Sequence, residues 1–523
     1  DSGGSNGGSL YKFLATGEAV YYECISTVDS TTNTTLSAQL SAGNWAKRYP
    51  NMTLFTEGAF SANNGFPSCI ALFQNRLCFS GVSGDVNTIW LSATDDYNNF
   101  TLGSLDTSAM SFTINSGNLD SIVWLVPHEA LIIGTSGSEW SLQAESDDVP
   151  VSPTSFSLQR KTTYGSNNTQ ATLINSAVIF AMRQGRKVRE WKYEYNSDDF
   201  VAQDLTIFSE HITEGGIENW AYQQQPDDVI WLIRSDGQLL GLTYERDQKV
   251  YAWHRHTCNT SGEFESVSVL PSSQSSDQVY LSTKVTINPS DWVASGTSYT
   301  QGNYVKYSGV TYVALQNHTS GSTTPNNDST NWEADSSTKR FIGVLRDREF
   351  TGYTTNFVGS DFATVYSSPS SATLTGLDYL EGLTVSVCAD GVPLADKTVS
   401  LGSINIGSTG HSKVVVGLNY TATLAPMYLD VETRSGTSMA SKKDAQSATI
   451  RFKDTYQAKV GQTKTTTDAV KFNPDITATN LYNEDATVWM DNASEFLKLV
   501  YVINDTPTPC TVLAMVVNVE GEF

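Results

Sequence analysis

Short apolar runs broken by glycine turns recur at a nearly constant spacing through the first half of the chain. Four such turns contain Gly84, Gly137, Gly185 and Gly237, and the steps from 84 to 137, 137 to 185 and 185 to 237 are 53, 48 and 52 residues. On both sides of each turn, β-branched and aromatic residues alternate with polar ones, a pattern typical of antiparallel strands. Repeats of about 40–50 residues are typical of β-propeller blades.

The same spacing predicts a fifth turn near residue 288, where the pattern is interrupted. The strand-like run VYLSTKVTIN ends at Asn288, and a matching run, KRFIGVL, begins only at Lys339. Between them the composition changes to small polar residues with regularly spaced aromatic residues. We therefore expect a separate small module at the tip of a propeller hairpin, because a domain with neighbouring ends can replace a turn at little entropic cost.

The pattern as a whole predicts an all-β protein: a β-propeller with an inserted small β module and a C-terminal β-sandwich or barrel-like domain. We expect an N-terminal linker and irregular β segment over 1–65, propeller blades over 66–288, the inserted module over 289–338, a return to the propeller over 339–375 and the C-terminal β-domain over 376–523. No helical stripe competes with this interpretation, and the aromatic content of 11% suits strands.

The charge balance bears on how this protein could interact with nucleic acid. The chain has 32 basic and 55 acidic residues, a net charge of −23, which argues against a protein that grips nucleic acid through its phosphates. The excess of acid either keeps the protein soluble or forms a wall that DNA can pass without sticking.

Motifs of catalysis and cofactor binding are absent from the sequence, so we expect no enzyme activity, no cofactor and no metal. The sequence has no HExxH, no glycine-rich phosphate loop and no GxSxG. His254 and His256 would share one face of a strand, which favours a polar strand surface over a metal site. Three pairs of acidic residues could suggest a glycosidase, but their neighbours are typical of turns: Asp95–Asp96, Asp198–Asp199 and Asp227–Asp228.

The inserted segment carries the most specific chemistry. Five of its aromatic residues are candidates for stacking on sugar rings: Trp292, Tyr299, Tyr307, Tyr312 and Trp332. The alternative is that these residues build the core of a domain with little other apolar volume. Their spacing with the glycines resembles the small carbohydrate-binding modules of bacterial chitinases, which implies host surface glycan as a partner. The segment departs from that pattern at Leu315–His318, where those modules carry an adjacent aromatic pair.

Several long motifs outside the insert resemble a second family. In order along the chain they are GFPSCIALFQNRLCFSG, TIWLSATDDYNNF, SAVIFAMRQGRKVREWKYEY, DDVIWLIRSDGQLLGLTYERDQKVYAWHRH, LDYLEGLTVSVCADG and VGLNYTATL. They are similar to the tail nozzle proteins of short-tailed bacteriophages, also called tail tubular or DNA-stabilisation proteins. The resemblance implies a homohexameric ring in the tail of the virion, assembled in the bacterial host cytoplasm, around the channel through which genomic DNA leaves.

That resemblance also implies partners: the tail adaptor ring, tail fibres or spikes, and a tail needle or plug. We therefore interpret the chain as a structural virion protein. Two alternatives remain open: a glycan-active enzyme whose propeller carries the active site, and a non-enzymatic adhesin for host glycan that needs only the inserted module.

Overall fold

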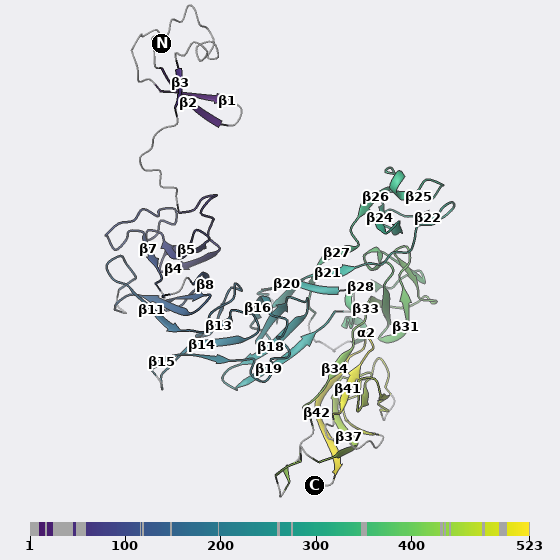
Figure 1. Cartoon of the computed structure of the whole chain (residues 1–523). Coiled ribbons are helices and arrows are strands. Elements are labelled where there is room, and N and C mark those ends of the chain that lie inside the picture. Colours follow the sequence, from purple (N-terminus) through teal and green to yellow (C-terminus); the bar gives the residue numbers. More distant parts are fainter. Residues whose placement is uncertain are drawn as a thin grey trace, which may run out of the picture. The chain divides into compact units, whose positions relative to one another are not determined.

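The structure is a computed structural model that describes most of the chain from residue 59 onward and three strands before it (Figure 1). It does not describe residues 1–9, 16–17, 25–44, 49–58, 116, 118–119, 147–148, 197, 259–261, 273–275, 347–352, 429–431, 434–435, 439–440, 473–475, 491–498 and 522–523. In the described part, the helical elements are α2 (Tyr353–Asn356) and the 3-10 turns η1 (Pro325–Asn327) and η2 (Asp378–Leu380). The all-β class is thus confirmed, and no described helix is long and apolar enough to cross a membrane.

The N-terminal part forms a unit of its own. Its strands β1 (Leu10–Ala15), β2 (Glu18–Cys24) and β3 (Trp45–Arg48) pair antiparallel in the order β1-β2-β3. The linker expected at the start of residues 1–65 lies outside the described residues.

Four antiparallel sheets follow, each of four strands in chain order. The first contains β4 (Cys69–Phe73), β5 (Arg76–Val82), β6 (Asp85–Leu91) and β7 (Met110–Thr113), and the second β8 (Ile122–Pro127), β9 (Leu131–Thr135), β10 (Glu139–Gln143) and β11 (Ser157–Thr162). The third contains β12 (Thr172–Ile174), β13 (Ala177–Ala181), β14 (Val188–Glu194) and β15 (Asp199–Asp204), and the fourth β16 (Ile217–Gln223), β17 (Val229–Arg234), β18 (Leu239–Glu245) and β19 (Val250–His256).

The periodic glycines occupy equivalent places in these sheets. Each lies in the turn between the second and third strands, so the spacing of the turns reports the spacing of the sheets. Gly185 and Gly237 have positive φ angles of 71° and 76°, a conformation that strains other residues. At Gly137 an added Cβ would lie 2.6 Å from the Asp120 carboxylate, so that side chain would have to move.

Consecutive sheets share hydrophobic cores, as propeller blades do. Phe73 and Ile89 of the first sheet pack with Ile133 of the second, and Trp124 on the opposite face of the second packs with Phe180 of the third, with ring centroids 5.9 Å apart. Similar cores join the third sheet to the fourth and the fourth to the fifth. This stacking of four-stranded sheets is consistent with a β-propeller.

The fifth sheet contains β20 (Gly262–Leu270), β21 (Gln278–Thr286) and β27 (Thr338–Val344). Strands β21 and β27 pair antiparallel from Tyr280↔Val344 to Thr286↔Thr338. The whole inserted segment therefore lies between the second and third strands, at the position that a glycine turn occupies in the other four sheets.

The chain beyond β27 differs from the expected domain boundaries. Strand β28 (Asp361–Ser367) pairs with β33 (Lys413–Leu418), and β29 (Thr373–Thr375) pairs with β32 (Ser403–Asn405). Residues 361–375, which the sequence pattern assigned to the propeller, therefore belong to the sheets that follow it. A strand's local alternation does not identify its partner, and here the partners lie about forty residues further along the chain.

The expected single C-terminal domain also contains two cores. The first is built around β28, β30 (Thr384–Ala389), β31 (Val392–Thr398) and β33. The second lies between a sheet of β34 (Ala422–Leu424), β38 (Lys459–Gly461), β39 (Thr467–Ala469) and β41 (Tyr501–Asn504) and a sheet of β37 (Lys443–Lys453), β40 (Asp485–Trp489) and β42 (Thr511–Gly521). A short hairpin, β35 (Glu432–Thr433) with β36 (Gly436–Thr437), completes this region.

Candidate functional site

The inserted module is made of five short strands. Strand β22 (Ser298–Tyr299) pairs with β25 (His318–Thr319), and β23 (Tyr304–Tyr307), β24 (Val310–Ala314) and β26 (Trp332–Asp335) form a second sheet. Gly302 and Gly309, with φ angles of 94° and 81°, make the tight turns before β23 and between β23 and β24. The glycines of the sequence pattern thus set where the module's strands begin and end.

Three of the five candidate stacking residues are in the core of the module. Tyr299, Tyr312 and Trp332 are only 3%, 9% and 3% exposed and pack together with Val305. These three side chains therefore do not present aromatic faces to a sugar, contrary to their place in the candidate set. They are buried because a module of this size has few other side chains with which to fill its interior.

Trp292 and Tyr307 remain partly exposed at the edge of that core. Their rings meet edge to face, with centroids 5.9 Å apart and an interplanar angle of 87°. Trp292 is held in place by its backbone N–H, which donates to the Lys306 carbonyl on β23 at 2.8 Å. Its indole Nε1–H is buried and has no acceptor among the described residues. The pair is the part of the candidate set that a ligand could reach.

The segment Leu315–His318 takes a different role from the aromatic pair that it replaces. Leu315, Gln316 and Asn317 are exposed. His318 packs against the core instead, with its ring centroid 5.6 Å from that of Tyr299 and 4.9 Å from that of Trp332. This part of the module presents amide groups to solvent rather than aromatic rings.

The module is attached to the chain at more than its two ends. The Asn303 side-chain amide donates to the Asp378 carboxylate at 2.8 Å, and Leu401 packs against the module core. At the base of the module, Lys339 lies over the Tyr304 ring and its ammonium group is 2.6 Å from Asp335. Partial desolvation acts to raise the pKa of Asp335, but the hydrogen bonds from Lys339 and from the Ser336 backbone outweigh it and hold this pKa below its ordinary value.

The other candidate chemistry lies at turns and on a strand. Asp95, Asp198 and Asp228 have positive φ angles of 60°, 50° and 47°, as aspartates in tight turns often do. His254 Nδ1 and His256 Nε2 lie 2.9 Å apart on β19. Within the described ranges, no group of three or more His, Cys, Asp and Glu side chains is placed to hold a metal ion.

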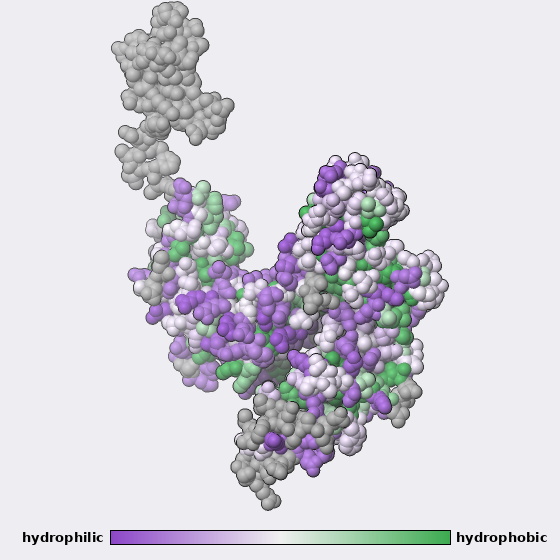
Figure 2. All heavy atoms as spheres, turned by 45° about the vertical axis from the view of Figure 1, so that its right-hand side comes forward, coloured by the Kyte–Doolittle hydropathy of each residue, from purple (hydrophilic) through white to green (hydrophobic). Residues whose placement is uncertain are grey.

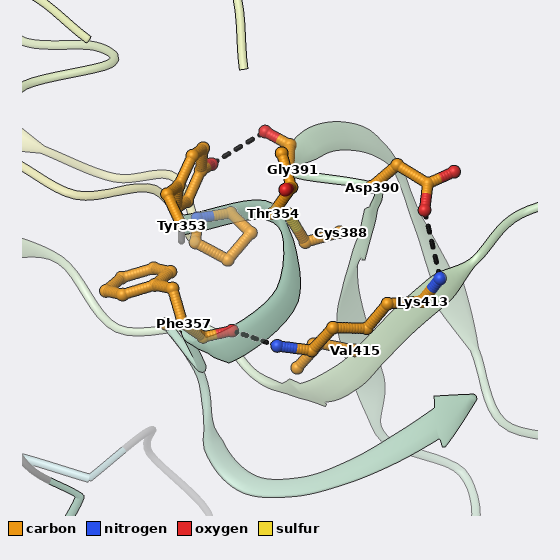
Figure 3. A pocket seen from close by; sticks show the side chains of 10 residues that line it. Tyr353, Thr354, Phe357, Cys388, Asp390, Gly391, Lys413 and Val415 are labelled. Carbon is orange, nitrogen blue, oxygen red and sulfur yellow. Dashed lines mark hydrogen bonds between the residues drawn. The ribbon is translucent and has the colours of Figure 1, made fainter. Parts of the chain in front are cut away.

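A small pocket lies beside helix α2 (Figure 3). The Tyr353 hydroxyl donates to the Gly391 carbonyl at 2.6 Å, and the Lys413 ammonium donates to the Phe357 carbonyl at 2.8 Å. Burial raises the pKa of the Cys388 thiol and of the Tyr353 hydroxyl, and it lowers the pKa of the Lys413 amine. With a volume of about 10 Å³ the cavity has room for one water at most, so this cluster supports the fold rather than a substrate.

A larger, open groove of about 430 Å³ borders the same helix. Its polar lining includes Thr354, Thr479, Asn480 and Asn483, and among the described lining residues the one carboxylate is that of Asp454. Glycoside hydrolysis commonly uses two carboxylates that flank the scissile bond, so this lining does not by itself make a hydrolytic site.

The comparisons with known proteins bear on the module. Residues 292–333 match the model of carbohydrate-binding module family 5/12. No curated protein sequence matches the chain. The inserted module is thus similar in sequence to a carbohydrate-binding family, as the spacing of its aromatic residues and glycines indicated.

Solved structures give only distant similarities. They include an auxiliary nutrient binding protein from Bacteroides thetaiotaomicron (11% identity, 54% of this chain and 70% of that chain, TM-score 0.26) and the WD40 domain of SCAP from fission yeast (10%, 67% and 84%, TM-score 0.27). A glycoside hydrolase family 43 arabinoxylan arabinofuranohydrolase from Bacillus subtilis shares 8% identity over 99% of this chain and 95% of that chain, with a TM-score of 0.19. With TM-scores this low, these structures assign no activity to the chain.

Proposed function

We propose that the chain is a structural protein whose inserted module contacts a glycan, and that it serves as a nozzle subunit in the tail of a short-tailed phage. The observation that carries the glycan contact is the family match over 292–333, combined with the partly exposed Trp292–Tyr307 pair. An aromatic face can cover the apolar C–H face of a sugar ring, while the polar groups around it bind the hydroxyls.

Support for the virion setting comes from the sequence motifs that resemble nozzle proteins. Those from the first half of the chain fall on the first, third and fourth sheets in chain order. In this proposal six copies form a ring that meets the adaptor ring on one side and fibres, spikes or a needle on the other, and DNA passes through it without specific binding.

The glycan contact is tested by retention of the full chain on chitin and on host surface polysaccharide. Replacing Trp292→Ala or Tyr307→Ala should each reduce retention at least tenfold, because each removes a ring that the ligand can reach. Tyr195→Ala is the matched control, since Tyr195 is 87% exposed and lies outside the module. If the parent chain is not retained, the module does not bind glycan and serves as a spacer or a docking surface.

Comparing Trp332→Ala with Trp292→Ala by hydrogen exchange distinguishes loss of the glycan contact from loss of the module's folded structure. Removing the buried Trp332 ring should cost about 3–5 kcal/mol, so hydrogen exchange should rise throughout residues 298–335, whereas Trp292→Ala, which removes a ring at the edge of the core, should raise exchange there much less. Equal effects of the two variants on exchange would contradict the division between core and contact residues.

The virion setting is tested by reconstruction of the phage particle. We expect the chain in a sixfold ring around the distal end of the tail tube. Another symmetry, or a position away from the tail axis, would overturn it. Release of soluble sugars from polysaccharide by the purified chain would instead favour the glycan-active enzyme.

A further inference from the structure

The open groove beside α2, called the α2 groove below, has the size of a ligand site. Its volume of about 430 Å³ falls in the range of about 300–1,000 Å³ that is typical of small-molecule sites. On the face that Figure 2 shows, hydrophobic residues occur among hydrophilic ones in several places, so a hollow with a defined set of polar groups is a more specific indication of a ligand than apolar surface. The polar groups of the α2 groove come from Thr354, Asp454, Thr479, Asn480 and Asn483.

Contacts with Gly391, in the turn between β30 and β31, hold one wall of the α2 groove. The Tyr353 hydroxyl donates to the Gly391 carbonyl at 2.6 Å (Figure 3). A Cβ added at Gly391, which has a φ of 82°, would lie 3.1 Å from the Ala478 Cβ and 3.2 Å from the Thr354 Cγ2. Glycine at this position thus lets α2 and the turn at 477–480 approach each other closely.

The segments that carry Asp454 and Asn483 are held side by side. Thr455 and Tyr482 exchange two backbone hydrogen bonds, with N···O distances of 3.1 and 2.9 Å. The Asp454 backbone N–H donates to Asn483 Oδ1 at 3.0 Å. Because these bonds form within the chain, a ligand does not have to bring the two segments together when it binds.

Two side chains at the α2 groove have polar groups available for a ligand. In the part of the chain that the structure describes, neither the Asp454 carboxylate nor the Asn480 side-chain amide has a hydrogen-bonding or ionic partner. Asp454 is half-buried and Asn480 is exposed. A carboxylate offers two acceptor oxygens, and an amide offers both donors and an acceptor. A ligand with several hydroxyl groups, each of which can donate and accept, matches this set.

The charge of the α2 groove narrows the class of ligand further. The described lining has no Lys, Arg or His, so an anionic ligand would meet only the negative charge of Asp454. A divalent cation such as Ca²⁺ takes six to eight oxygen ligands, several of them commonly carboxylates, whereas the described lining supplies one carboxylate. Ala478 and Leu481 add apolar surface to the lining. Uncharged rings that carry hydroxyl groups, which are neutral sugars, fit both the polar and the apolar groups.

We propose that the α2 groove binds a sugar unit of a neutral glycan, as a second contact that is separate from the inserted module. The Asp454 carboxylate accepts hydrogen bonds from sugar hydroxyls, the Asn480 amide binds another oxygen of the ligand, and Ala478 and Leu481 face the C–H groups of the ring. With one carboxylate in the described lining, binding rather than hydrolysis is expected. The inference goes beyond the proposed function, because it needs neither the module nor the virion setting.

Hydrogen exchange of the full chain tests this contact, with chitotetraose, cellotetraose and maltotetraose at millimolar concentration as probes. The chain carries Trp292→Ala, so that the contact of the module is weakened. At least one probe should lower the exchange rate of the amides in 476–483 by about half once half of the grooves are occupied. Titration of the probe against this exchange rate then gives its affinity.

Adding Asp454→Asn to the same chain should weaken this affinity about tenfold, because hydrogen bonds to a charged acceptor contribute more than those to a neutral one. Asn also accepts the φ of 45° at this position, so the fold should be kept. Asp468→Asn is the matched control, since Asp468 is exposed on β39 and does not line the groove.

Four results would overturn the inference. One is that no probe slows exchange in 476–483, and another is that Asp454→Asn leaves the affinity unchanged. The third is stronger protection by spermidine or Mg²⁺ than by any sugar, which would assign the groove to a cation. The fourth is protection that is present in the parent chain and absent with Trp292→Ala, which would assign the sugar to the module. Retention through the module is measured separately, so its failure is distinguishable from the failure of this contact.

Discussion

Burial couples the ionisation of Asp361, at the start of β28, to folding. Burial raises the pKa of its carboxyl to about 6, and this carboxylate in turn raises the pKa of the Cys258 thiol, which burial already raises. Because the pKa in the folded state lies above that in the unfolded chain, the folded state binds the proton more tightly between about pH 4 and pH 6. The free energy of unfolding should therefore fall as the pH rises through this range.

Replacing Asp361→Asn should remove this pH dependence. The variant should be more stable than the parent at pH 7, by up to about 3 kcal/mol for a shift of about two pKa units, and equally stable at pH 4. Urea unfolding at both pH values measures the difference, with Asp468→Asn as the control because Asp468 is exposed on β39. Equal gains at the two pH values would show that the charge is not the cause.

At the scale of the element, the glycine turn between β17 and β18 has two requirements that another residue cannot meet. Gly237 has a φ of 76°, and a Cβ there would lie 2.6 Å from the Cβ of Glu263 on the fifth sheet. Gly237→Ala should therefore lower the free energy of unfolding by about 1–3 kcal/mol. Gly343→Ala in β27 is the control, since an added Cβ there meets nothing within 4 Å. A shift in the urea midpoint no larger than that of the control would contradict the requirement.

The inserted module is an element that we expect the fold to tolerate losing. Joining Asn288 to Lys339 through a short glycine-containing turn keeps the register in which Val285 lies opposite Lys339 and Tyr280 opposite Val344, so β21 and β27 should still pair. The deletion also removes the hydrogen bond between Asn303 and Asp378, which should cost about 1 kcal/mol.

Cooperative unfolding and ring incorporation measure the outcome of this deletion. The full-length variant Asn303→Ala is the control, because it removes the same hydrogen bond and keeps the module. Loss of cooperative unfolding in the deletion alone would show that the module is part of the core architecture.

At the scale of the whole molecule, the net charge of −23 leads to an expectation for the ring of six copies that we propose. Six copies would carry −138, and carboxylates on the channel wall would repel phosphates at distances comparable to the Debye length. Many basic side chains already pair with acids, as Lys187 does with Asp204 at 3.0 Å and with Glu210 at 2.7 Å. We therefore expect acidic side chains to dominate the wall in a reconstruction of the ring. A wall rich in unpaired Lys and Arg would contradict this expectation.

Local patterns by themselves determined where this chain turns and what kind of strand lies between the turns. The steps between Gly84, Gly137, Gly185 and Gly237 located the turns between the second and third strands of four sheets. The interruption of the pattern where a fifth turn was expected located the module. These features are readable because strand alternation and the turn residues depend on neighbours within a few residues. The aromatic and glycine spacing of the module is equally local, and its family resemblance followed from it.

Only the tertiary structure decided which aromatic faces are available and which distant strands pair. Trp292 and Trp332 are the same residue type in one module, but one lies at the edge and the other fills the core. Strand β28 pairs with β33, and nothing in its own alternation distinguishes that partner from a propeller strand. Ile70 and Phe73 are both apolar residues of β4, yet only Phe73 belongs to the core shared with the second sheet. Burial and pairing are set by contacts between segments far apart in the chain, and these exist only once the sheets have stacked.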